Sequence, residues 1–192
     1  SDGTGDIVAV SAFVNGVLTY DIFNAGTFGA TQGAATLLPY TYAGNGLARQ
    51  PGRQGNPPLR NVDPLDDRVA TNAWEINGKT YFVQTITPTG TDYTRVRLVV
   101  MDSTTKAVIQ ILDIGEGDFD FYQGALAVSD QRAVISYNRS GVDPATGKIG
   151  IFANTYRIRA DGTVQQIGTP IFVKDSLTPG YLNGNVEATG LP

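Results

Sequence analysis

The chain has 192 residues and a mass of 20.4 kDa, a size typical of one domain. It contains no Cys and no His, which excludes Ser-His-Asp and Cys-His catalysis, zinc or copper sites built on His or Cys, and haem ligation by His. The net charge is −4 and the 14 basic residues are scattered, so we expect no nucleic-acid partner. No apolar run approaches the roughly 20 residues of a membrane helix, so we expect no membrane span.

Short runs of β-forming residues recur along the chain, and no segment has helical periodicity. Turn residues that tolerate positive φ separate these runs, for example Asn15-Gly16, Asn77-Gly78 and Asp161-Gly162. The sequence therefore predicts an all-β fold of about ten strands joined mostly by short antiparallel turns. In chain order these strands are 7–14, 17–22, 71–76, 80–86, 95–101, 107–114, 124–128, 133–138, 149–159 and 163–173.

One stretch between the second and third predicted strands has no strand rhythm. Residues 33–67 are predicted to form a long irregular loop, rich in Gly, Pro, Asn and Gln between 44 and 58. Arg49, Arg53 and Arg60 give this loop positive charge in an acidic protein. It is either a solvated connection or a segment that packs on a partner.

An internal repeat indicates how the strands are organised. Residues 73–83 align with residues 125–135 at a step of 52, and a second hairpin follows each copy, which gives four strands per unit. Fainter copies lie at 14–16 and 182–184. Antiparallel four-stranded units at this spacing are typical of β-propeller blades. We predict that residues 1–192 form a single β-propeller segment of about three to four blades, with an open stack or sandwich of sheets as the alternative.

Four segments carry a family resemblance: Asp66-Asp67-Arg68, 74–78, 120–128 and 134–141. Between Asp66 and Pro179 the chain resembles secreted bacterial proteins with sialidase-like (BNR-type) propeller repeats, which are mostly uncharacterised. The resemblance implies an exported propeller, often a large one, and implies no activity. The Ser-x-Asp-x-Gly-x-Thr-Trp box of sialidases has no intact copy here. We therefore expect the ring to be completed by further copies, by more of the same polypeptide or by a second polypeptide.

Two sets of residues are candidate sites. Acidic side chains crowd one short glycine-containing stretch, and several converging oxygens are what calcium requires; the alternative is a solvated acidic loop. The candidate calcium ligands are Asp113, Glu116, Asp118 and Asp120. Aromatic rings stack on sugars and arginine pairs with carboxylates, although packing between blades is the commoner use of aromatic residues. The candidate ligand-binding residues are Trp74, Tyr122, Tyr137 and Arg139.

These features predict an exported, non-enzymatic β-propeller module with a structural or binding role at the cell surface or outside the cell. The alternative is a sialidase-like glycoside hydrolase, or a glycan-binding propeller, whose site is completed by residues outside this chain. Tyr137 would then be the nucleophile and Arg139 would bind a substrate carboxylate.

Overall fold

The computed structural model describes residues 6–14, 17–24, 30–36, 40–41, 48–51, 62, 64, 69, 72–105, 107–143 and 145–176; before residue 48 it describes only the strand backbone. The described residues form strands and turns and contain no helix, so the predicted all-β class is confirmed. Twelve strands fall within these ranges. They are β1 (Asp6–Val14), β2 (Val17–Asn24), β3 (Ala30–Thr36), β4 (Tyr40–Thr41), β5 (Trp74–Ile76), β6 (Lys79–Pro88), β7 (Arg95–Asp102), β8 (Val108–Ile114), β9 (Phe119–Val128), β10 (Arg132–Gly141), β11 (Gly150–Ile158) and β12 (Val164–Asp175).

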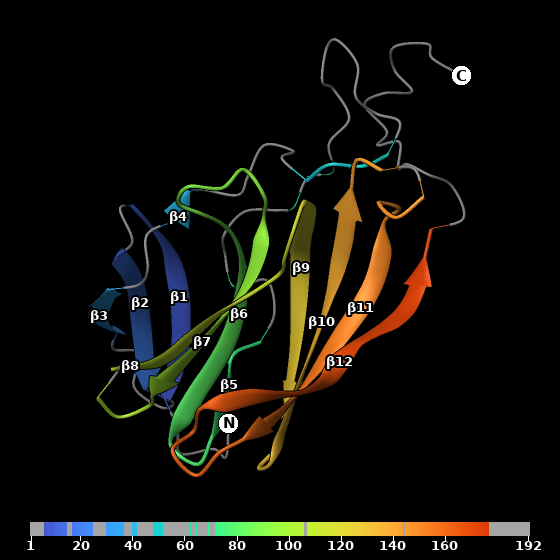
Figure 1. The fold of residues 1–192 in the computed structure, drawn as a ribbon. Helices are drawn as coiled ribbons and strands as arrows, with labels where there is room; N and C mark the ends of the chain where they lie inside the picture. Colours follow the sequence, from blue (N-terminus) through green and yellow to red (C-terminus); the bar gives the residue numbers. More distant parts are fainter. Residues whose placement is uncertain are drawn as a thin grey trace.

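The strands form three antiparallel meanders (Figure 1). The first has the order β1-β2-β3. The second, which we call the first sheet, has the order β5-β6-β7-β8, with β4 paired to the far end of β6. The third, the second sheet, has the order β9-β10-β11-β12. In Figure 1 the first sheet stands between the β1–β3 meander and the second sheet.

The predicted irregular loop is partly wrong at its start. β3 continues to Thr36, and β4 lies inside the range predicted to be irregular. The sequence of β3, Ala-Thr-Gln-Gly-Ala-Ala-Thr, has few β-branched or aromatic side chains, so propensity gave no strand signal there. Its pairing with β2 along the whole strand supplies the ladder hydrogen bonds that propensity could not indicate.

The two four-stranded sheets correspond to the two copies of the predicted repeat. The β5–β6 hairpin turns through Asn77 and Gly78 at φ values of 52° and 69°, which are the positive angles expected for an Asn-Gly turn. Trp74 in β5 donates its indole N–H to the carbonyl of Leu126 in β9 at 2.8 Å. These two residues are one repeat step apart, so equivalent first strands lie side by side. This arrangement is compatible with propeller blades, and the described strands do not close a ring.

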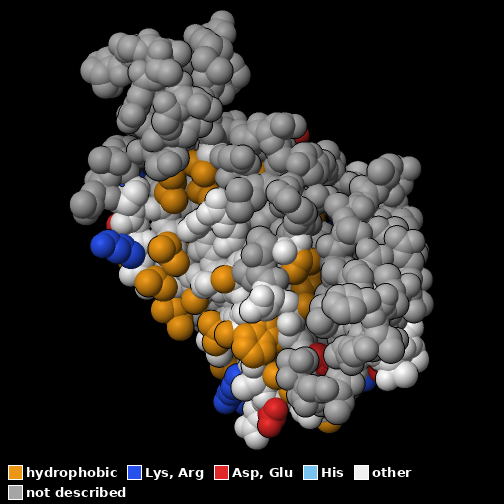
Figure 2. Space-filling view, turned by 180° about the vertical axis from the view of Figure 1, so that it is seen from behind, with side chains coloured by type: hydrophobic (Ala, Val, Ile, Leu, Met, Phe, Trp, Pro, Cys, Tyr) orange, Lys and Arg blue, Asp and Glu red, His pale blue; other side chains and the backbone are white. Residues whose placement is uncertain are grey.

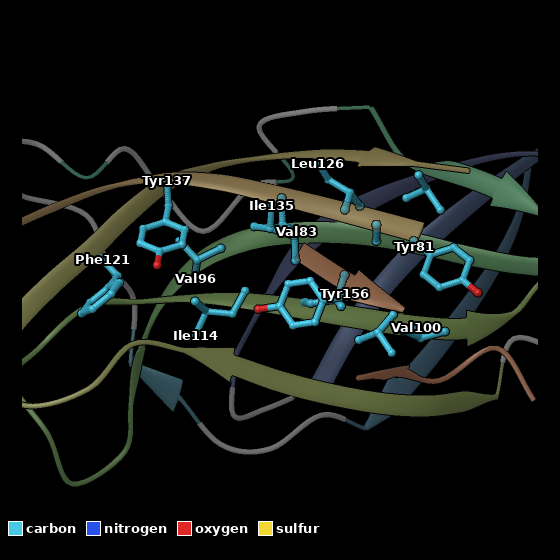
Figure 3. Close-up of a cluster of buried hydrophobic side chains, with 14 residues drawn as sticks. Tyr81, Val83, Val96, Val100, Ile114, Phe121, Leu126, Ile135, Tyr137 and Tyr156 are labelled. Carbon is cyan, nitrogen blue, oxygen red and sulfur yellow. The ribbon is translucent and has the colours of Figure 1, made fainter. Parts of the chain in front are cut away.

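One hydrophobic core lies between the facing sides of the two sheets (Figure 3). The first sheet contributes residues such as Val83 and Leu98, and the second contributes Leu126, Ile135 and Tyr156. β9 approaches β7 closely at Gly124, where an added Cβ would come within 2.6 Å of a Val96 methyl group. Polar contacts also join β8 of the first sheet to β12 of the second. The Gln110 side chain donates to the Val164 carbonyl and accepts from the Val164 N–H.

The two sheets differ in how much of their surface is covered. Almost every residue of β6 and β7 is buried, whichever face it occupies. In β10, buried and exposed residues alternate through the first half of the strand, and in β12 every residue after Val164 is exposed. The first sheet is therefore covered on both sides, whereas the second is covered fully on only one. Within the described residues there is no helix long and apolar enough to cross a membrane.

Candidate functional site

Arg139 lies between two aromatic rings on the core-facing side of the second sheet. Its guanidinium carbon is 4.1 Å from the centre of the Phe152 ring and 4.5 Å from the centre of the Phe119 ring. This sandwich exists because Phe119 is at the start of β9, Arg139 is near the end of β10 and Phe152 is at the start of β11, so all three meet at one end of the sheet. Cation–π attraction fixes the plane of the guanidinium.

The Arg139 guanidinium has no ion-pair or hydrogen-bond partner among the described residues. Its Nε atom is buried without an acceptor. Burial lowers the pKa of Arg139, and the charges of Tyr137 and Glu116 oppose that shift. A planar cation held between two rings presents its N–H edge to an incoming acceptor, and carboxylates and phosphates match that edge.

Arg95 is nearby and shows how a fully engaged arginine differs. Its guanidinium donates to the carbonyls of Thr94, Gly117 and Phe119 at distances of 2.6–3.0 Å. Burial lowers the pKa of Arg95 as well. Arg95 has a structural role, because its guanidinium donates to three backbone carbonyls. Arg139 is the arginine of this cluster whose guanidinium is available to bind a ligand.

Tyr137 is buried beneath Arg139 rather than exposed beside it. Its ring stacks on Phe152, with centroids 6.2 Å apart and planes at 12°, and its hydroxyl donates to Asn154 at 2.9 Å. Burial raises the pKa of Tyr137 to about 12. A tyrosine that resists ionisation to this degree is a poor nucleophile near neutral pH.

The structure does not bring all four predicted ligand-binding residues together. Tyr137 and Arg139 share the cluster just described. Trp74 lies at the first strand of the other sheet, half-exposed, with its indole N–H already bonded. Tyr122 is buried on the opposite side of β9, and burial raises its pKa to about 12. The structure therefore groups Tyr137 and Arg139 with Phe119 and Phe152, and it places Trp74 and Tyr122 elsewhere.

The four predicted calcium ligands are also not brought together. The described residues contain no group of three acidic side chains close enough to hold a metal ion. Asp113 pairs with Arg97 through two hydrogen bonds of 2.6 and 2.8 Å. Glu116 and Asp118 are exposed in the turn after β8. Two of the four carboxylates are paired with arginines, Asp113 with Arg97 and Asp120 with Arg49, so the four candidate ligands do not converge on one point. The calcium site stays a prediction from the sequence.

Asp120 ties the predicted irregular loop to the sheets. It is fully buried and accepts from the Arg49 backbone N–H at 2.7 Å, from the Arg49 guanidinium at 3.2 Å and from the Thr94 N–H at 2.8 Å. The Ser140 hydroxyl donates to the Arg49 carbonyl. This part of the loop packs on the protein itself, an arrangement that the positive charge of Arg49 alone did not predict. A contact between residues 71 positions apart has no signal in a single sequence.

A second candidate site is the side of the second sheet that faces away from the core, which we call the outward face. The strand registers place two mostly apolar rows there, each with one hydroxyl side chain. One row runs through Ala127, Val134, Thr155 and Ile167, and the other through Ala125, Ser136, Ala153 and Ile171. Val134 is 40% exposed and Ile171 is 56% exposed. Seen from behind, hydrophobic side chains form a row between Lys or Arg side chains on the described part of the surface (Figure 2).

The outward face is closed at one end and open over the rest. Asp120, Tyr122 and Ser140 occupy its end nearest Arg49, and all three are buried there. Beyond them no described segment covers Val134 or Ile171. The strand alternation in the sequence placed Val134 in a strand but gave no way to tell which face would be left open.

The fold and these sites define an all-β protein of antiparallel four-stranded sheets with one free arginine site and one open apolar face. Comparisons with protein-family models, with curated proteins and with solved structures found no match. The resemblance to sialidase-like propeller repeats therefore stays a prediction from the sequence.

Proposed function

We propose that this chain is an exported, non-enzymatic β-propeller module with a structural or binding role at the cell surface or outside the cell. The observation that supports this proposal is the difference between the two sheets: the first is covered on both faces, and the second presents apolar rows on an open face. A blade-like sheet cannot cover both of its faces by itself and depends on a neighbour. The open face is where this module would meet that neighbour.

The chemistry of the Arg139 cluster supports a non-enzymatic role. The Tyr137 hydroxyl is buried, is bonded to an amide oxygen and has a raised pKa, so it is unsuited to attack a sugar carbon. We expect no turnover of a panel of chromogenic glycosides by the purified chain. Turnover that disappears in Tyr137→Phe and persists in the matched variant Tyr156→Phe would overturn the non-enzymatic proposal and establish the glycosidase.

Glycan binding without hydrolysis is a second candidate, and the free edge of Arg139 favours it. A carboxylate-bearing sugar would pair with the guanidinium, and the neighbouring rings would contact apolar sugar surface. On a glycan array we expect acidic glycans to be retained and this retention to be lost in Arg139→Ala. Arg132→Ala, an exposed arginine on the same strand, is the matched control. Equal binding by wild type and Arg139→Ala would remove this candidate.

A further inference from the structure

Three hairpin turns meet at one end of the two sheets, and a pocket of about 160 Å³ lies between them. The turns join β5 to β6, β9 to β10 and β11 to β12, and all three lie at the lower end of the sheets in Figure 1. The Arg139 cluster lies at the opposite end of β10, so the pocket is a separate place in the fold. The apolar part of its lining consists of Ile76, Tyr81 and Ile158.

Hydrogen bonds and close packing hold the three turns together, so the pocket exists before any ligand arrives. The Tyr81 hydroxyl donates to the Gly162 carbonyl at 3.0 Å, and Figure 3 shows the Tyr81 hydroxyl pointing away from the other core side chains. The Ile158 N–H donates to the Gln131 carbonyl at 3.0 Å, which joins the end of β11 to the β9–β10 turn. Packing is close as well, because a Cβ added at Gly162 would come within 2.7 Å of the Lys79 side chain. A preformed pocket avoids the cost of ordering its walls on binding.

The polar part of the lining contains one acidic and one basic side chain that are not paired. Asp130 and Arg159 are both exposed, and neither side chain forms an ion pair or a hydrogen bond with another described residue. Lys79 also lines the pocket, but it is already in an ion pair of 2.8 Å. Arg159 lowers the pKa of Asp161 without pairing with it, and the Asp161 carboxylate accepts two hydrogen bonds from Thr163. One carboxylate and one guanidinium therefore remain available for charged groups of a ligand.

We propose that this pocket binds a small zwitterion of the free α-amino acid class, with the ligand carboxylate on Arg159 and the ligand ammonium group on Asp130. The volume fits this class, because a cavity of about 150 Å³ holds a molecule of the size of benzene. The apolar part of the lining would contact a small aliphatic side chain of the ligand. The site goes beyond the structural or binding role proposed above and does not depend on it.

The affinity should be modest and should depend on salt. Both charged side chains are exposed, so water and ions screen their attraction to a ligand. We expect a dissociation constant of about 1 mM for L-leucine at low ionic strength. The ¹⁵N–¹H NMR spectrum of the full chain, titrated with L-leucine, should show shifts concentrated in the three turns that form the pocket.

Two relatives of leucine that each lack one charged group test the two contacts separately. Isocaproate lacks the ammonium group and isoamylamine lacks the carboxylate, so each should bind at least about tenfold more weakly than L-leucine. Asp130→Asn should weaken leucine binding by about tenfold and leave isocaproate binding unchanged. Arg159→Gln should weaken leucine binding to a similar degree and leave isoamylamine binding unchanged.

Matched controls carry the same substitutions outside the pocket. Asp118→Asn changes an exposed carboxylate in the turn after β8, and Arg157→Gln changes an exposed arginine on β11. Both should bind L-leucine as wild type does. Because all four substituted side chains are exposed, we expect every variant to fold, and far-UV circular dichroism checks this.

Several results would overturn the proposal. The absence of shifts in the three turns at tens of millimolar leucine would do so, as would shifts confined to the Arg139 cluster. If isocaproate or isoamylamine binds as tightly as leucine, the pocket does not recognise a zwitterion. Equal weakening by the control substitutions would show a general effect of charge instead of a site. Binding of D-glucose in place of leucine would show that the pocket takes a neutral polar ligand.

Discussion

The first and second sheets share a strand order and differ in their surroundings. Val99 in β7 is fully buried on the side of the first sheet that faces away from the core, whereas Val134 on the corresponding side of the second sheet is 40% exposed. Both positions are β-branched and apolar, and both sit in a middle strand of a four-stranded meander. The difference lies in the segments that pack over the two valines. The second sheet has apolar side chains on its outward face, as the first sheet does, but no described segment packs over them.

The largest expected effect contrasts these two valines. Val99→Asp places an unpaired carboxylate in a fully buried site, which should prevent folding. Val134→Asp places the same group at the open face and should lower the free energy of unfolding of the monomer by only about 1 kcal/mol, through the low strand propensity of Asp. Urea denaturation at low protein concentration measures both. Equal destabilisation by the two substitutions would remove the distinction between the sheets.

The next effect concerns the attachment of Arg49 to the second sheet. Asp120→Ala removes the acceptor of three N–H groups, one of them charged, and should lower the free energy of unfolding by about 3 kcal/mol. Asp118→Ala alters an exposed carboxylate two residues away and should have little effect. Thermal unfolding of the two variants measures this effect. A similar melting temperature for both would contradict a stabilising role for the hydrogen bonds between Asp120 and the Arg49 segment.

A smaller effect is expected where the two sheets touch. Gly124→Ala would place a methyl group 2.6 Å from Val96, so the sheets must move apart, at a cost of about 1–3 kcal/mol. Gly117→Ala is the control, since its Cβ would meet nothing within 4 Å and only the positive φ of 55° opposes it. Denaturant midpoints compare the two variants. The sheets are less tightly packed than described if the Gly124 variant is the more stable.

Alkaline pH should weaken the second sheet through its buried tyrosines. Burial raises the pKa of Tyr122 and of Tyr137 to about 12, against about 10 in an unfolded chain. Below pH about 10 both states hold the phenolic proton and stability is unaffected; between about 10 and about 12 the unfolded chain ionises first, so stability falls. Denaturant unfolding at a series of pH values measures the fall in stability, and tyrosinate absorbance reports the ionisation of the tyrosines that accompanies it. The double variant Tyr122→Phe/Tyr137→Phe should lose less stability than wild type between pH about 10 and about 12. An equal loss in both proteins would contradict the raised pKa values of the two tyrosines.

The smallest expected effect is that of calcium. Because Asp113 and Asp120 are already paired with arginines, neither excess calcium nor EDTA should shift the melting temperature. Differential scanning calorimetry of the same preparation under both conditions measures this. A rise of several degrees in calcium would show that a cation site forms and that these ion pairs give way to it.

The sequence predicted the elements that local chemistry determines. Asn77-Gly78 marked a hairpin that forms with positive φ. The repeat step of 52 aligned Trp74 with Leu126 as equivalent positions, and the structure adds that these two residues are hydrogen-bonded. β3 escaped prediction because its Ala, Gly and Gln residues lack strand propensity and it is held by pairing with β2. Local signals therefore predicted the strands that carry their own propensity, and they missed β3 and the two-residue strand β4, which are held by pairing with β2 and β6.

The candidate sites were predicted less well, because they depend on contacts between distant residues. Tyr137 and Arg139 do share a cluster, as their adjacent positions on one strand suggested. Phe119 and Phe152, which hold the guanidinium, lie on the flanking strands and carried no signal of their own. The acidic stretch looked like a metal site because its partners Arg97 and Arg49 lie 16 and 71 residues away from the carboxylates they bind.

Hydrogen–deuterium exchange of the full wild-type chain, measured at low and at high protein concentration, tests the central claim most directly. The first sheet is covered within one chain and the second is not, so exchange should slow with concentration in β10–β12 and stay constant in β6 and β7. Exchange that is independent of concentration in both sheets would contradict the claim that the outward face of the second sheet is where one module stacks on the next.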